Sequence, residues 1–346
     1  MAYTTIDKPE LYFNTKLYTG TGSELAVTGV GFQPDFVWSK NRQEGEGHRL
    51  FDSVRGATKF IRSNNSDAEG TAAQTLKSFD SDGVTIGTDA DMNTSGEANV
   101  LWNWKAGTSF SNDASATGVG SIDSTGSKST IAGFSIISFT GTESGTPSIA
   151  HGLSSTPEFI ISKARDVSDN WMVFHGSFSA QEYISLNSTG ASASASSVWN
   201  SLPSSTVINM GDNAGVNDDG AMIMYAFNSV KGFSKFGSYT GNGNADGTFV
   251  YTGFKPAFVI IKPSSYSNSW LILDNKRNTF NPTNTRLEAD GTGADYSGLD
   301  YTDFLSNGFK IRTSNSHPND SGGTLIYIAF AESPFTNSSG VPNNAR

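Results

Sequence analysis

Two short charged motifs contain residue types that could bind a ligand. An aspartate is followed three residues later by an arginine at Asp52/Arg55 and again at Asp274/Arg277. A carboxylate and a guanidinium held this close could clamp a charged ligand, or they could form an ion pair that fixes a loop. Because the pair recurs along the chain, we interpret these four residues as structural repeat positions and favour the loop-fixing role.

Asparagine–glycine turns form a second recurring pattern. Asn93, Asn217 and Asn319 each precede a glycine by three residues, and aspartates lie close to all three. Hard oxygen ligands gathered in a loop could hold Ca²⁺. None of the three stretches has the ligand spacing of an EF-hand loop, and tight turns need the same residue types. We therefore treat the three asparagines as structural repeat positions and predict no metal site, and calcium binding by a loop stays open.

No group of residues has the spacing of a catalytic site. The four histidines are spread along the chain without the spacing of a zinc site. A glycosidase needs two carboxylates flanking a cleft, and no acid recurs with a partner at strand spacing. A serine nucleophile on a G-x-S-x-G turn is also missing. We predict a non-enzymatic protein without catalytic residues or a cofactor, with a carbohydrate-active enzyme as an alternative.

Aromatic side chains in polar loops are the best candidates for ligand contact. Trp199 lies in "SASSVWNSLP" and Tyr266 in "KPSSYSNSW". Exposed aromatic rings in such loops can stack on sugar faces, so we predict that these two residues bind a ligand. Trp171 and Trp270 occupy matching repeat positions, which favours a place in the core.

A seven-residue segment that recurs three times shows which elements position these residues. It reads "PDFVWSK" at 34–40, "PEFIISK" at 157–163 and "PAFVIIK" at 256–262. A polar residue follows each closing lysine at the same distance of twelve residues, which gives the pairs Lys40/Asp52, Lys163/His175 and Lys262/Asp274. Internal repetition of this kind indicates one structural unit carried three times.

The repeated segments have the residue types of β-strands. Their apolar runs are β-branched or aromatic, and further short runs follow with turn signals between them. We predict an all-β fold of three tandem antiparallel β-sandwich repeats, jelly-roll or concanavalin-like, each burying its own core and touching its neighbours from the side. Only residues 67–78 are compatible with a helix. The expected domains are repeat 1 at 1–107, a Gly/Ser-rich linker at 108–129, repeat 2 at 130–230, repeat 3 at 231–336 and a tail at 337–346.

Composition excludes several classes of partner. The net charge of the 346-residue chain is −10, and no run of Lys or Arg offers the basic face that nucleic-acid binding requires. No stretch approaches the length of a membrane span, so we expect no membrane insertion. The chain has no cysteine, and its first residues lack the apolar region of a signal peptide. These features predict synthesis in a cytoplasm without export by the general secretion route.

Long strings in the chain resemble a known family. The strings "GVGFQPDFVWSKNR", "GFSKFGSYTGNG" and "IYIAFAESPF" look like repetitive virion structural proteins of marine tailed phages, including cyanophages. The resemblance covers residues 10–336 and implies sandwich units that resemble concanavalin or SPRY domains. It also implies localisation in the virion, because phage proteins are made in the host cytoplasm and leave by lysis. It transfers no catalytic residue.

The resemblance and the repeats together predict a structural role in a bacteriophage particle. We expect a tail-fibre or adhesin subunit that presents sandwich loops to a host surface glycan, another receptor or a neighbouring virion protein. Phage fibres are commonly trimeric, which predicts a homotrimer, and tandem units would add valency during host attachment. A capsid decoration or head-associated protein of the same fold is the alternative location.

Overall fold

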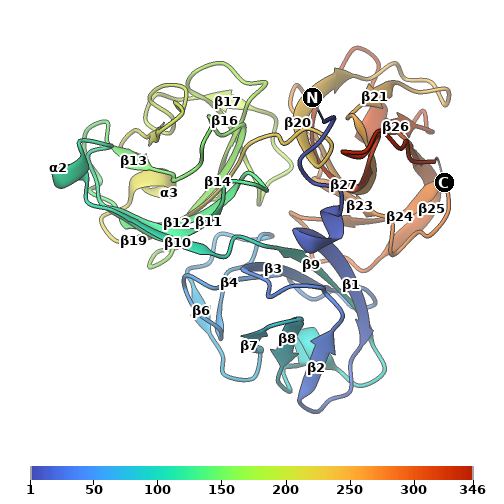
Figure 1. Ribbon diagram of the computed structural model, residues 1–346, viewed down its shortest axis with the longest axis horizontal. Coiled ribbons are helices and arrows are strands. Elements are labelled where there is room, and N and C mark those ends of the chain that lie inside the picture. The colour runs from blue at the N-terminus through green and yellow to red at the C-terminus, as the bar shows by residue number, and fades with distance from the viewer. Residues whose placement is uncertain (1, 345–346) are drawn as a thin grey trace.

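The fold consists almost entirely of antiparallel strands. A computed structural model describes residues 2–344. Three lobes surround a common centre (Figure 1), and we call them unit 1 (residues 9–104), unit 2 (residues 108–227) and unit 3 (residues 234–334). Every pairing between the named strands is antiparallel, which confirms the predicted all-β antiparallel architecture. The helices of residues 2–344 are single short turns.

Unit 1 contains a four-stranded sheet in the order β1-β9-β3-β4 and a three-stranded sheet in the order β2-β8-β7. Its elements are η1 (Pro9–Leu11), β1 (Phe13–Thr19), β2 (Leu25–Thr28), β3 (Phe36–Asn41), β4 (Arg49–Asp52), β5 (Lys59–Phe60), β6 (Gly70–Thr71), β7 (Leu76–Asp80), β8 (Gly83–Ile86), α1 (Ala90–Asn93) and β9 (Ala98–Trp104).

Unit 2 repeats this core order as β12-β19-β14-β15, within a larger sheet, and pairs β13 with β18 in a small second sheet. Its elements are β10 (Thr108–Asn112), α2 (Ala114–Thr117), β11 (Ser124–Ser129), β12 (Phe134–Thr140), β13 (Ser148–Ala150), β14 (Phe159–Ala164), β15 (Met172–His175), β16 (Glu182–Ser185), β17 (Ala193–Ser194), β18 (Val207–Asn209), α3 (Ala214–Asn217) and β19 (Ala221–Phe227).

Unit 3 has the order β20-β27-β22-β23 and continues through β24, β25 and β26 to β21 in one eight-stranded sheet. Its elements are β20 (Ser234–Thr240), β21 (Phe249–Tyr251), β22 (Phe254–Pro263), β23 (Leu271–Asp274), β24 (Thr283–Glu288), β25 (Tyr296–Leu305), β26 (Gly308–Ile311), α4 (Ser316–Asn319) and β27 (Thr324–Pro334).

The three repeated segments occupy equivalent places. β3, β14 and β22 are each the third strand of the recurring order, between the last strand of the unit and a short partner strand. Phe36 lies opposite Asp52, Phe159 opposite His175 and Phe258 opposite Asp274. The constant register follows from the constant spacing in the sequence, since a slip of one residue would turn every side chain to the other face.

Strand β3 shows why these segments are apolar on both faces. Phe36 and Trp38 enter a central cluster that contains residues of all three units, whereas Val37 between them enters the private core of unit 1. Strands β14 and β22 alternate in the same way, so units 2 and 3 also have private cores. The units were expected to be separate beads with side contacts. They share a continuous core instead, because alternate residues of each repeated strand face the centre.

Two stretches of residues differ from expectation. Residues 108–129, expected to be a linker, form β10 and β11, and β11 pairs with β12 to widen the sheet of unit 2. Phe110 and Ile122 pack against the core of that unit, which gives this polar stretch a reason to fold. Residues 67–78, which we considered compatible with a helix, contain β6 and the start of β7. Tertiary contacts override the weak helix propensity there.

The expected C-terminal tail at 337–346 folds back as far as the structure describes it. Ser338 donates backbone and side-chain hydrogen bonds to Asp7, and Asn343 donates to the carbonyl oxygen of Pro334 at 2.9 Å. Residues 345 and 346 lie outside the described range. The described part of the tail therefore contacts the N-terminal residues through Asp7.

The lysine that closes each repeated segment is buried. Lys40, Lys163 and Lys262 are at most 1% exposed, and burial lowers the pKa of each to about 8. Their ammonium groups donate to backbone carbonyl oxygens: Lys163 to Ala164 at 2.8 Å and to Val167 at 3.3 Å. Each lysine thus supplies hydrogen bonds to carbonyl oxygens of the loop that follows its strand.

Replacing one of these lysines is expected to leave loop carbonyls without donors. We expect Lys163→Met to lower the free energy of unfolding by about 2 kcal/mol, since an unsatisfied buried carbonyl costs roughly 1–3 kcal/mol. Urea denaturation measures the change, and Lys8→Met at an exposed site is the matched control. Equal stability of the two variants would contradict a structural role for the ammonium group.

Candidate functional site

The two Asp/Arg pairs lie inside the molecule, where one unit meets the next. The side chains of all four residues are fully buried. Arg277 donates to Asp274 at 2.6 Å, to Asp295 at 2.9 Å and to the carbonyl oxygen of Ile272 at 2.9 Å. Burial would raise the pKa of Asp274, but the charge and hydrogen bonds of Arg277 outweigh it and hold that pKa below its usual value. The pairs are loop-fixing ion pairs and do not form an exposed clamp.

These repeat positions also join the units in a ring. The hydroxyl of Tyr225 in unit 2 donates to Asp52 of unit 1 at 2.7 Å, and the indole of Trp102 in unit 1 donates to Asp274 of unit 3 at 3.1 Å. His175 of unit 2 lies at the equivalent position, with Nε2 3.3 Å from the carbonyl oxygen of Tyr327 in unit 3. Each unit therefore contacts the next through the same position of the repeat.

A second set of equivalent contacts runs around the ring in the opposite sense. The indole nitrogens of Trp171 and Trp270, eight residues after the buried lysine, donate to Arg62 O at 2.8 Å and Ser185 O at 3.0 Å in the preceding unit. His48 takes this position in unit 1, with Nε2 3.0 Å from Glu288 O. The predicted core position of both tryptophans is confirmed by their complete burial.

The three recurring asparagines hold loops within their own units. Asn319 accepts a hydrogen bond from the backbone nitrogen of Asn242 at 2.9 Å and donates to Thr313 O at 2.7 Å. Asn93 and Asn217 make equivalent bonds to the loops that follow β1 and β12. All three side chains are buried. Within residues 2–344, no three His, Asp or Glu side chains converge as metal ligands.

The two loop aromatics predicted to contact a ligand are held by the protein itself. Trp199 is only 2% exposed and belongs to the core of unit 2, so its predicted exposure is wrong. Its neighbour Val198 is buried with it, and the packing of these two apolar side chains anchors the polar loop to the core. Tyr266 is half-buried, and its hydroxyl donates to Ser316 O at 2.7 Å. Burial raises the pKa of Tyr266 to about 12.

An open pocket with an exposed aromatic side chain lies on unit 3. We call it the Tyr296 pocket; its volume is about 370 Å³, and its lining residues are Arg286, Leu287, Glu288, Gly293, Ala294, Asp295 and Tyr296. Tyr296 is 50% exposed. The guanidinium of Arg286 stacks 4.5 Å from the centre of its ring and pairs with Glu288 at 2.9 Å. An aromatic face beside a guanidinium and a carboxylate suits a polyhydroxylated ligand.

The loop that carries this pocket is fixed at both ends. Asp295 accepts hydrogen bonds from Arg42 of unit 1 at 2.8 Å and from Arg277 of unit 3 at 2.9 Å. Its backbone nitrogen donates to Arg42 O at 2.7 Å. Arg286 also donates to the hydroxyl of Tyr301 at 2.8 Å. The pocket is therefore preorganised, which lowers the cost of ordering it when a ligand binds.

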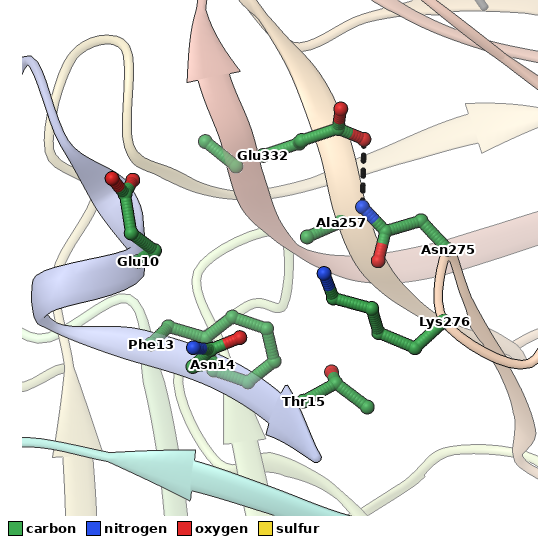
Figure 2. A pocket seen from close by; sticks show the side chains of 9 residues that line it. Glu10, Phe13, Asn14, Thr15, Ala257, Asn275, Lys276 and Glu332 are labelled. Atoms are coloured by element: carbon green, nitrogen blue, oxygen red, sulfur yellow. Dashed lines mark hydrogen bonds between the residues drawn. The ribbon is translucent and has the colours of Figure 1, made fainter. Parts of the chain in front are cut away.

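A much smaller pocket lies where β1 and η1 of unit 1 meet β22 and β27 of unit 3. Figure 2 shows Glu10 and Glu332 on opposite sides of it, with Glu332 turned toward Asn275, whose side-chain nitrogen donates to it at 2.6 Å. The pocket has a volume of about 50 Å³. Ligand sites for small molecules usually reach about 300 Å³ or more, so this pair of carboxylates has no room for a sugar ring between them.

A family model described as a domain of unknown function (DUF7483) matches residues 8–334. The chain belongs to this family. The match runs through all three units, so the family is defined by the whole ring and not by one repeat. Comparisons with curated proteins and with solved structures found no match.

The Tyr296 pocket was not predicted from the sequence. Tyr296 lies in "GTGADYSG", a polar stretch like those of Trp199 and Tyr266, and it begins strand β25, so the available signal was an aromatic residue in a polar stretch. Sequence spacing cannot show which of these rings faces solvent.

None of the helices in residues 2–344 is long and apolar enough to cross a bilayer.

Proposed function

We propose that the chain is a non-enzymatic structural protein of a phage particle, a tail-fibre or adhesin subunit that binds a host surface glycan through unit 3. The single observation that carries the binding role is the fixed pocket beside the exposed ring of Tyr296. The phage assignment rests on the resemblance of the repeated strings. We also propose that each unit is a jelly-roll or concanavalin-like sandwich, and that the chain forms a homotrimer.

The chemistry of the pocket supports a sugar as the ligand. The face of an aromatic ring packs against the C–H groups of a sugar, while Arg286 and Glu288 supply a donor and an acceptor for its hydroxyl groups. The side chains of both residues remain partly exposed, at 20% and 30%. Their mutual ion pair holds them in place before a ligand arrives.

Tyr296→Ala is expected to weaken glycan binding at least fivefold, because a stacked ring at a well-packed contact contributes about 1–3 kcal/mol. A glycan array with the wild-type chain identifies the ligand, and calorimetry then compares the variant. Phe280→Ala is the matched control, since Phe280 is 79% exposed in unit 3 and does not line the Tyr296 pocket. Equal loss in both variants, or binding unaffected by Tyr296→Ala, would remove the pocket from the proposal.

The location in the particle needs a separate test. Antibody labelling of intact particles is expected to mark the tail, whereas labelling of the whole head surface would favour the decoration alternative. Incubation of the pure chain with host polysaccharide is expected to release no sugar. Measured release would instead support the carbohydrate-active alternative.

A further inference from the structure

The three junctions between units can be compared position by position. The same backbone hydrogen bond closes each of them: Glu69 N to Arg165 O at 2.8 Å between units 1 and 2, Ser192 N to Ser264 O at 2.8 Å between units 2 and 3, and Asp295 N to Arg42 O at 2.7 Å between units 3 and 1. Glu69, Ser192 and Asp295 are therefore equivalent, and so are Arg165, Ser264 and Arg42.

Two of the junctions are filled by one acid between two arginines. Glu69 binds Arg165 through both carboxylate oxygens at 2.9 Å and Arg55 at 3.2 Å. At the junction of units 3 and 1, Asp295 also lies between two arginines, with Oδ2 2.8 Å from Arg42 and Oδ1 2.9 Å from Arg277. A guanidinium that reaches across each junction from the neighbouring unit completes the packing.

The junction of units 2 and 3 lacks all three of these groups. Phe178 stands where the other units have Arg55 and Arg277, Ser192 replaces the acid, and Ser264 replaces the crossing arginine. These three residues line one cavity of about 190 Å³. That volume equals about six water molecules at roughly 30 Å³ each. The cavity therefore occupies the place that an arginine side chain fills at the other two junctions.

The cavity keeps a negative charge. Glu182 lines it, accepting hydrogen bonds from Ser192 Oγ at 2.7 Å and from the backbone and side chain of Ser179, both at 3.1 Å. Within residues 2–344, no lysine or arginine nitrogen lies within 4 Å of its carboxylate. The ring of Phe178 forms an apolar wall, and a guanidinium stacks well on an aromatic face.

We propose that this cavity is a binding site for a guanidinium group, presented by an arginine side chain of a partner protein. The partner's arginine would take the place of the missing crossing residue, with Glu182 as its counter-ion, Phe178 as its stacking surface and the hydroxyls of Ser192 and Ser264 as further acceptors. The site is separate from the Tyr296 pocket, so it does not depend on glycan binding.

Titration of the full chain with N-acetyl-arginine amide, followed by NMR, tests the site. We expect saturable binding with shifts centred on Phe178 and on Ile326, which also lines the cavity. The neutral N-acetyl-citrulline amide is expected to bind at least fivefold more weakly. Glu182→Gln is expected to weaken arginine binding at least fivefold. The double variant Ser192→Glu/Ser264→Arg fills the cavity from within and is expected to abolish binding while keeping or raising the melting temperature.

Ser201→Arg changes the net charge by +1, as Glu182→Gln does, but at an exposed site of unit 2, and it is expected to bind like the wild type. Equal affinity for the arginine and citrulline compounds, shifts elsewhere on the chain, or no saturation would overturn the proposal. So would wild-type binding by the folded double variant. If the wild-type chain does not bind arginine and the double variant is more stable than the wild type, the cavity is only a solvent-filled gap.

Discussion

Asp274→Ala is expected to lower the free energy of unfolding by about 3–5 kcal/mol, the usual cost of breaking a buried ion pair from one side. The substitution leaves Arg277 buried with only Asp295 and a carbonyl oxygen as partners. It also removes the acceptors of the Trp102 indole and of the Arg277 backbone nitrogen. Urea denaturation measures the loss, and tryptophan fluorescence reports whether one transition remains.

Unit 2 provides the control for this variant, because it carries a version of the same motif without the ion pair. His175 and Phe178 occupy the positions of Asp274 and Arg277 and pack with ring centres 5.8 Å apart. The double variant Asp274→His/Arg277→Phe is therefore expected to lose less stability than Asp274→Ala alone. A double variant that is the less stable of the two would show that the charges themselves are needed at the junction of units 3 and 1.

A single cooperative transition is expected in both experiments, because the three units share a central core in addition to their private cores. Phe36, Phe159 and Phe258 belong to one central cluster, in which Phe258 packs against Trp104 of unit 1 with ring centres 5.8 Å apart. Separating one unit would expose this apolar surface to water. The ring of polar contacts through Asp52, His175 and Asp274 surrounds the cluster and fixes the order of the units.

The sequence predicted the strands and their equivalence but not their assembly. Constant spacing between Phe36 and Asp52 and its two copies was enough to set a register, because β pairing depends on local separation. The apolar character of both faces of β3 was also visible, yet it fits an inner strand of a sandwich as well as a strand between two cores. Which surface covers Trp38 depends on contacts far away in the sequence, and no local pattern carries that information.

The site was harder to predict than the fold for the same reason. Trp199 and Tyr296 both lie in polar stretches of the sequence. Val198 beside Trp199 is buried with that ring, whereas the small residues Gly293 and Ala294 precede Tyr296, which begins β25 and is half-exposed. The Asp/Arg pairs were interpreted as structural because they recur, and in the structure both are buried ion pairs. In unit 2 the pair is replaced by His175 and Phe178. The sequence shows this replacement but not the cavity that lies beside Phe178.

Acidification from pH 7 to pH 5 is expected to destabilise the chain strongly, through histidines that are held neutral. Burial lowers the pKa of His48 to about 3 and those of His151 and His175 to about 4. In each ring Nδ1 accepts a hydrogen bond, from Trp38 at 2.8 Å in His48 and from backbone nitrogens at 3.1 Å in the other two. Protonation of the ring would place a hydrogen on Nδ1, where it would face the N–H group that now donates to this nitrogen.

The sign follows from where the protons bind. In the unfolded chain these histidines take up protons below about pH 6.5, whereas in the folded chain they stay neutral to about pH 4. Between these values the unfolded state binds more protons, so stability falls as the pH falls. The loss is about 1.4 kcal/mol per histidine and pH unit, up to roughly 6 kcal/mol for three by pH 5. That is a large share of the 5–15 kcal/mol typical of folded domains.

Other buried groups change the size of this effect but not its direction near pH 6. Lys40 and Arg277 near His48 lower its pKa further, next to the effect of burial. Burial raises the pKa values of Asp35 and Asp290, so the folded chain binds their protons first and gains some stability in more acidic solution. Burial also lowers the pKa of the fourth histidine, His317. His175→Asn keeps an acceptor for Ser177 N and is expected to reduce the slope of stability against pH by about a quarter to a third between pH 6.5 and pH 5. Urea denaturation at several pH values measures the slope, and an unchanged slope in this variant would mean that His175 does not resist protonation in the folded chain.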